Sequence, residues 1–290
     1  MRFVTLRREE EAQVHVVVQQ NYVVSLGSLD ARIKGDLLRL ISLRPSRVEL
    51  DSLLALARSR RDLWEPLDAT RYAPPYLRPR KILGIGLNYR QHAEDRSEQV
   101  LEEPASFIKG DHTIGGFGAS VRIPRESDAV TGEAELGMII GREMRNVPTD
   151  RVFDYVFGVT PVLDFTAEDI LLRNARYLTR AKNFPDFFLF GPEVVTLDEF
   201  LAERDLSDAE VATLVAREGA RESRIRVDRV KSMIHSPESL LSSHSYLMPW
   251  FPGDILSTGT PGAIHVTPGE SVRARVSGLA ELVAQVEGRG

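Results

Sequence analysis

Cysteine is absent from the 290 residues of this chain, which excludes disulfides, thiolate metal ligands and a cysteine nucleophile. Long hydrophobic runs are missing too. The longest apolar stretches, such as residues 136–140, fall far short of the roughly 20 residues that cross a bilayer. The first residues lead directly into a charged stretch at 7–11, with no hydrophobic signal segment. We therefore expect a cytoplasmic protein with no membrane partner.

An excess of basic residues is lacking as well. Lysine and arginine number 37 against 42 aspartate and glutamate, giving a formal net charge of −5. This balance excludes the basic footprint of a nucleic-acid-binding protein. Hydrophobic residues at 42% and charged residues at 27% are typical of a globular protein. The length allows one large domain or two unequal ones.

The hydrophobic pattern divides the chain into three parts. Residues 1–71 combine strand-like segments with apolar residues at helical spacing, which predicts a small α+β domain. Residues 72–80 are rich in proline and are expected to form a linker. From residue 81 to 290, many short β-like segments alternate with turn residues, and only 166–177 and 237–247 show a helical pattern. This predicts a β-rich α+β fold, a sandwich or roll, rather than a parallel βαβ architecture.

Two glutamates stand two residues apart in the apolar segment 133–140. Side chains two apart on a strand point to the same face, so Glu133 and Glu135 should project side by side. The following strand, 159–163, delivers Asp164 at its polar end. Three carboxylates without cysteine or histidine suit a hard cation, Mg²⁺ first, with Mn²⁺ or Ca²⁺ as alternatives.

The same spacing also fits an ordinary strand with one wet face, with Asp164 capping a helix that begins at Thr166. Spacing alone leaves both interpretations open. The choice depends on whether other chemically active residues converge on the carboxylates.

Several candidates could converge there. His92 follows a buried strand and has the ordinary pKa of a general base, and Glu94 or Asp95 could orient its ring. Lys182 stands beside several phenylalanines, which fits either a lysine whose stem is buried and whose ammonium is solvated or a desolvated cation facing an anion. Gly259 and Thr260 occupy a glycine-rich turn that either serves structure alone or brings backbone and hydroxyl donors to a ligand.

Six motifs in order resemble the fumarylacetoacetate hydrolase family across residues 81–286. They are residues 82–92, 107–109, 133–141, 164–167, 181–184 and 252–261. The resemblance implies a mixed β-sandwich roll, usually a homodimer, with a small variable N-terminal domain. It also implies a divalent metal held by Glu133, Glu135 and Asp164, and catabolic chemistry on a small 2-oxo or 1,3-dicarbonyl acid.

The resemblance assigns roles as well. Lys182 would stabilise an enolate, and His92 with Asp95 or Glu94 would activate water for carbon–carbon bond hydrolysis. Substrate contacts would come from the residues Tyr89, Lys109, Gly259 and Thr260. The same scaffold also serves 2-oxo acid decarboxylases and dienoate isomerases or hydratases, which stay open as alternatives.

The chain departs from the family pattern at two positions. Glu168 stands where many members have an arginine that binds an anionic substrate, so Arg173, Arg176 or Arg180 would have to replace it. Pro185 stands where many have an aspartate, and it shifts Asp186 by one place. These changes favour a further alternative, a descendant that binds metal without catalysis.

Overall fold

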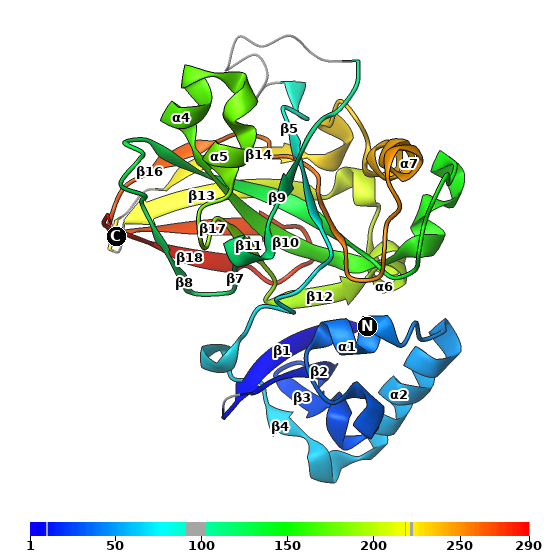
Figure 1. Ribbon diagram of the computed structural model, residues 1–290. Helices are drawn as coiled ribbons and strands as arrows, with labels where there is room; N and C mark the ends of the chain where they lie inside the picture. Colours follow the sequence, from blue (N-terminus) through cyan, green and yellow to red (C-terminus); the bar gives the residue numbers. More distant parts are fainter. Residues whose placement is uncertain (10, 91–101, 218, 221–222, 290) are drawn as a thin grey trace.

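The computed structural model describes residues 1–9, 11–90, 102–217, 219–220 and 223–289 (Figure 1). Strands dominate, arranged as two sheets that pack face to face, so the predicted β-rich sandwich roll is confirmed. In the described parts of the chain, no helix is long and apolar enough to cross a membrane.

The N-terminal residues form a small α+β unit, drawn in blue in Figure 1. Its second helix starts with a capping box, in which the side chains of Ser46 and Glu49 each bond the other residue's backbone N–H. Its first strand pairs with a strand of the following region, so the unit extends the main sheet. The domain boundary at residue 71 stays a prediction. The elements are β1 (Arg2–Arg8), β2 (Glu11–Gln19), β3 (Tyr22–Ser25), α1 (Leu37–Ser42), α2 (Arg47–Ser59) and β4 (Glu65–Pro66).

The proline-rich segment 72–80 is fastened to both of its neighbours. The Ala73 N–H donates to the Thr5 carbonyl, and the Thr5 hydroxyl donates to the Pro75 carbonyl. Tyr76 is fully buried, and its hydroxyl donates to the Gly253 carbonyl at 3.0 Å. The segment therefore connects two parts of one sheet and is hydrogen-bonded to both.

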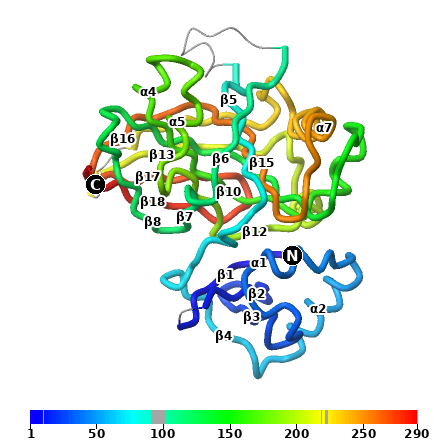
Figure 2. Tube along the Cα trace, in the orientation of Figure 1, coloured from blue at the N-terminus to red at the C-terminus, as the bar shows by residue number. Residues whose placement is uncertain are grey.

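Thirteen described strands belong to the larger sheet, whose main path runs β4, β3, β2, β1, β12, β10, β9, β15, β5, β6. At its centre, β9 and β10 pair over eleven positions and are buried along almost their whole length. Figure 2 shows β5 and β15, which are far apart in sequence, running side by side. The strands of this region are β5 (Ile82–Gly86), β6 (Ala105–Lys109), β7 (Ile114–Gly115), β9 (Val130–Ile140), β10 (Val156–Ala167), β11 (Phe188–Phe190), β12 (Glu193–Thr196), β15 (Ile255–Ser257) and β16 (Ile264–Val266).

A second sheet of five strands, in the order β14, β13, β17, β18, β8, covers one face of β9 and β10. Inward residues such as Val211, Val272 and Ala284 join Leu136 and Phe165 in one hydrophobic core. This packing buries the face of β9 and β10 that is turned towards the second sheet. The strands are β8 (Ala119–Arg122), β13 (Glu210–Arg217), β14 (Arg224–Arg229), β17 (Glu270–Val276) and β18 (Leu282–Glu287).

The helix predicted at 166–177 begins later and is broken. Strand β10 stays paired with β9 as far as Ala167, so the helix α4 (Glu168–Arg173) starts only there. Asn174 has an extended backbone and ends α4, and the chain continues through the 3-10 turn η7 (Ala175–Tyr177) into α5 (Leu178–Lys182). The helix predicted at 237–247 is confirmed as α7 (Pro237–Leu247), whereas α6 (Leu197–Glu203) was not predicted.

Candidate metal centre and active site

The three predicted carboxylates come from the two central strands. Glu133 and Glu135 lie on β9, and Asp164 lies on β10 directly opposite Glu133. All three are almost completely buried, at 5%, 1% and 0% exposure, and carboxylate oxygens of the three lie within 4.8 Å of one another. The interpretation as a wet strand face with Asp164 as a helix cap is therefore wrong, because β10 continues past Asp164 and the carboxylates point inward.

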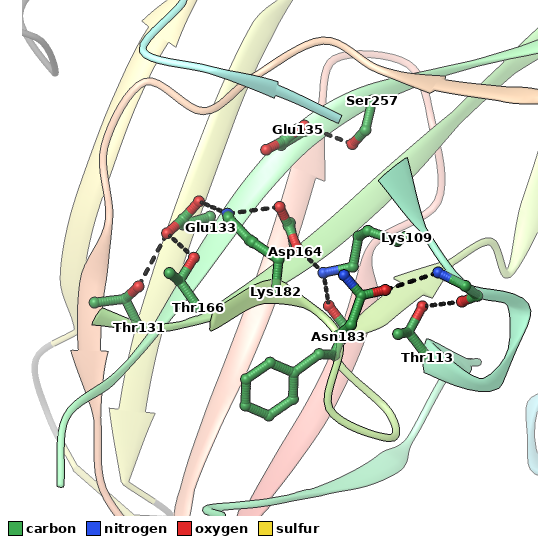
Figure 3. A network of polar contacts seen from close by, with 12 residues as sticks. Lys109, Thr113, Thr131, Glu133, Glu135, Asp164, Thr166, Lys182, Asn183 and Ser257 are labelled. Carbon is green, nitrogen blue, oxygen red and sulfur yellow. Dashed lines mark hydrogen bonds and ion pairs between the residues drawn. The ribbon is translucent and has the colours of Figure 1, made fainter. Parts of the chain in front are cut away.

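Glu133 is held by hydroxyl groups on its own face of the sheet. Its Oε1 accepts hydrogen bonds from Thr131 at 2.9 Å and Thr166 at 2.7 Å, while its Oε2 accepts one from Lys182 at 2.9 Å (Figure 3). Thr131 and Thr166 were missed by the sequence analysis. The period-2 rule could have found them, because each lies two residues from a carboxylate on the same strand.

Glu135 takes its hydrogen bonds on one oxygen. The Ser257 hydroxyl at 2.5 Å and the Gly259 N–H at 2.9 Å both donate to Oε2. Burial raises the pKa of Glu135, the negative charge of Asp164 adds to this effect, and the resulting pKa is about 8. A buried carboxylate with so high a pKa is short of compensating positive charge.

Asp164 bridges two buried lysines. Its Oδ1 accepts from Lys109 at 2.5 Å, and its Oδ2 accepts from Lys182 at 2.7 Å (Figure 3). Burial by itself lowers the pKa of Lys182, but the charges of Asp164, Glu133 and Glu135 outweigh it and raise the pKa above its usual value. The ammonium group of Lys182 therefore faces buried carboxylates and not solvent.

The donor set fits a divalent cation. Three carboxylates and two ammonium groups carry a net charge of −1 when all are ionised, and the high pKa of Glu135 is the physical sign of that imbalance. A hard cation among carboxylate oxygens supplies the missing positive charge. Glu133, Glu135 and Asp164 would hold it.

This electrostatic arrangement predicts a pH-dependent affinity for Mg²⁺. Below pH about 8, Glu135 of the metal-free protein carries a proton that the cation must displace, so affinity should rise about tenfold per pH unit and level off above that value. Calorimetry in two buffers of different ionisation enthalpy should show about one proton released per Mg²⁺ near pH 6 and almost none near pH 9. Proton release that does not change across this range would contradict the prediction.

Lys109 bonds the candidate ligand Asp164 and the carbonyl oxygen of Phe187, which accepts at 2.9 Å. We expect Lys109→Met to lower the free energy of unfolding by about 2–3 kcal/mol, because it removes one charged partner from a buried carboxylate. Chemical denaturation would measure this loss. Lys34→Met is the control, since that lysine is 65% exposed and should shift stability by less than about 0.5 kcal/mol. Equal midpoints for the two variants would show that the buried pair contributes nothing.

A pocket opens directly in front of Glu133 and Lys182, with a cavity volume of about 330 Å³. Thr260 and Thr166 also line it, and the remaining lining is mostly apolar. Lys182 Nζ lies 5.0 Å from the centre of the Phe107 ring, a distance suited to a cation–π contact. That ring needs Gly84 beneath it, since a Cβ there would come within 2.4 Å of the ring. The pocket thus has a polar floor and apolar walls.

The other residues predicted to bind substrate have different positions. Thr260 lies in the pocket lining, but Gly259, which has a φ of +94°, directs its N–H to Glu135. Lys109 contacts Asp164, and Tyr89 is fully buried with no hydrogen-bond partner for its hydroxyl among the described residues. Neither Lys109 nor Tyr89 lines the pocket within the described chain. Substrate contacts by these three residues stay predictions.

The predicted water-activating residues His92, Glu94 and Asp95 lie outside the described residues. They belong to the segment that follows β5, and its described start lies beside the pocket, because Gly86 and Leu87 are part of the lining. Their proposed role therefore rests on the sequence alone.

The two departures from the family pattern lie away from the pocket lining. Glu168 pairs with His265 at 2.8 Å. Of the three arginines expected to replace the family's cation, Arg173 pairs with Asp169 at 3.1 Å, and none belongs to the described lining. Asn183 next to Lys182 accepts from the Gly110 N–H and donates to two carbonyl oxygens, so it anchors the end of α5.

The chain is similar to known proteins in sequence and in fold. Residues 81–287 match the family model described as fumarylacetoacetate (FAA) hydrolase C-terminal. An uncharacterised protein of Pyrococcus horikoshii is 35% identical over 211 residues, which cover 71% of this chain and 87% of that protein. The mitochondrial oxaloacetate tautomerase Fahd2a of Rattus norvegicus is 28% identical, covering 76% of this chain and 71% of its own.

The fold also has a close counterpart among solved structures. The maleylpyruvate hydrolase of Sphingobium sp. SYK-6, solved in complex with manganese(II) and pyruvate, superposes with a TM-score of 0.80 over the full length of both chains. At a sequence identity of 21%, this superposition shows a shared fold and no more.

Proposed function

Because this chain belongs to the fumarylacetoacetate hydrolase family, whose members include hydrolases, isomerases and tautomerases, we propose that it is a divalent-metal-dependent carbon–carbon bond hydrolase. Its substrate would be a small 2-oxo or 1,3-dicarbonyl acid of the acylpyruvate type, and Mg²⁺ would be its metal, with Mn²⁺ or Ca²⁺ as alternatives. The observation that carries this proposal is the buried carboxylate triad, of which Glu133 lines a pocket together with Lys182. Assembly as a homodimer remains a prediction.

The polar floor of the pocket fits the chemistry of a 2-oxo acid. A divalent cation bound there would draw electron density from the adjacent carbonyl and carboxylate oxygens and so favour an enolate. Lys182 would add a positive charge next to that site, since its ammonium group bonds Glu133 and Asp164. The hydroxyl of Thr260 in the lining donates to the Gly262 carbonyl at 3.3 Å and would turn from it to donate to a substrate oxygen.

Hydrolysis of an acylpyruvate needs only water as a second reactant. Water adds to the acyl carbonyl, the carbon–carbon bond breaks, and its electron pair becomes the enolate of pyruvate. A proton returned to carbon completes pyruvate and releases a carboxylic acid. His92, oriented by Asp95 or Glu94, would take the proton from water.

The test is incubation of the purified protein with Mg²⁺ and acetylpyruvate. Loss of enol absorbance together with equal amounts of pyruvate and acetate would support the proposal. A chelator should stop the reaction, and Mg²⁺ should restore it. Unchanged acetylpyruvate in the presence of folded, Mg²⁺-loaded protein would overturn hydrolysis of this class.

A second candidate is tautomerisation of a 2-oxo acid such as oxaloacetate, which the name of the rat relative favours. It needs the same enolate but no attack by water. Loss of the oxaloacetate enol without CO₂ release would support it, whereas CO₂ formation above a metal-only blank would indicate a decarboxylase.

A further inference from the structure

The apolar part of the pocket is built from two walls. Leu171, Leu172 and Leu178 come from the α4–η7–α5 segment, and β5, β6 and the residue that follows β5 supply the other wall. The residues of that other wall are Ile85, Gly86, Leu87, Ala105 and Phe107. The side chains of Glu133 and Lys182 are the only charged ones lining the pocket within the described chain.

Three charged side chains of α4 have partners outside the pocket lining. Glu168 at the start of α4 bonds His265, and Asp169 accepts from Arg173 and from the Ser127 hydroxyl at 2.6 Å. The contacts with His265 of β16 and with Ser127 hold the start of α4 in place. The residues of α4 and η7 that line the pocket are apolar, and the leucines of the α4–η7–α5 segment form the wall.

Leu172 lines the pocket although it is 71% exposed. Leu171 and Leu178 are half-buried. Exposure of large apolar side chains to the water in an open cavity is unfavourable. A ligand with a matching apolar surface displaces this water, and its binding is thereby stabilised. An unpaired carboxylate in the same place would lose its hydration without gaining a partner.

We infer that the substrate carries an apolar alkyl or aryl arm rather than a second carboxylate, and that Leu171, Leu172 and Leu178 determine this specificity. The inference rests on the proposed function, since the oxo-acid head must occupy the polar floor beside Glu133 and Lys182. The arm then extends from the floor along the leucine wall. The apolar wall also disfavours oxaloacetate as a substrate, because the second carboxylate of oxaloacetate would contact the leucines.

A matched pair of stable ligands tests the arm. 2-Oxohexanoate and 2-oxohexanedioate have the same chain length and differ at the far end, methyl against carboxylate. Titration calorimetry on the Mg²⁺-loaded protein should show the monoacid binding at least about tenfold more tightly, since the diacid buries an unpaired charge. Affinity should also rise by up to about fourfold per methylene from pyruvate to 2-oxohexanoate. Equal or tighter binding of the diacid, or binding of neither compound, would overturn the inference.

Arginine substitutions on the leucine wall should reverse the preference. Leu178→Arg and Leu172→Arg each place a cation at the wall, so the diacid should gain at least about tenfold relative to the monoacid. The exposed position of Leu172 protects that variant from a folding defect. Leu201→Arg, at a 42% exposed leucine of α6, is the matched control and should leave the ratio unchanged. Unchanged ratios in both wall variants would overturn the assignment of specificity to the leucines.

Failure of this inference and failure of the proposed function give different results. If acylpyruvates are cleaved but those with a terminal carboxylate react as well as alkyl ones, the apolar arm is wrong and hydrolysis stands. If no acylpyruvate is cleaved while 2-oxohexanoate still binds in preference, hydrolysis is wrong and the apolar arm stands.

Discussion

Glu133→Ala is expected to abolish Mg²⁺ binding, with a loss of affinity of at least about 100-fold by titration calorimetry. Removal of a residue that only orients a ligand already costs 10- to 100-fold, and Glu133 would itself be a ligand. Its loss also leaves Lys182 paired with Asp164 alone, which makes the site more positive and still less favourable for a cation. Activity that depends on the metal should disappear with the binding.

Two further variants separate loss of the ligand from loss of the fold. Glu133→Gln keeps the shape and the hydrogen-bonding capacity of the side chain and should lose Mg²⁺ binding in the same way. Glu126→Ala removes an exposed carboxylate and should bind Mg²⁺ as the parent protein does. Unchanged affinity in Glu133→Ala would remove this residue from the metal site.

Lys182→Met is expected to lower kcat by about 100- to 1000-fold, the usual effect of removing one group that stabilises developing negative charge. The affinity for Mg²⁺ should stay the same or increase, because an ammonium group within 3 Å of two candidate metal ligands would repel the cation. Steady-state kinetics at saturating Mg²⁺ and calorimetry on the same preparation would measure both effects.

This pair of readouts distinguishes catalysis from structure. A variant that merely unfolds would lose Mg²⁺ binding together with activity, and its unfolding midpoint would fall. Lys34→Met, at an exposed lysine, controls for the general effect of the substitution. A kcat within tenfold of the parent value would contradict a catalytic role for Lys182.

Local patterns predicted much of the fold because they follow from strand geometry. Glu133 and Glu135 are two residues apart, a spacing that puts both side chains on one face of a strand. The strand β9 includes the whole segment 133–140. The helix 237–247 has a serine cap and a proline at its start, and α7 has the predicted bounds. The helix predicted from residue 166 failed because pairing with β9 keeps Thr166 in β10, a long-range effect that a local pattern does not contain.

The sequence by itself determined the three carboxylates, the lysine beside the phenylalanines and the family to which their order belongs. Only the tertiary structure decided how these groups act on one another. Pairing of β9 with β10 places Glu133 opposite Asp164, and burial together with the charge of Asp164 raises the pKa of Glu135 to about 8. The fold also turns Glu168 towards His265 and leaves leucines around the pocket. Charge compensation and pocket polarity depend on distances between residues remote in the chain, which no local pattern encodes.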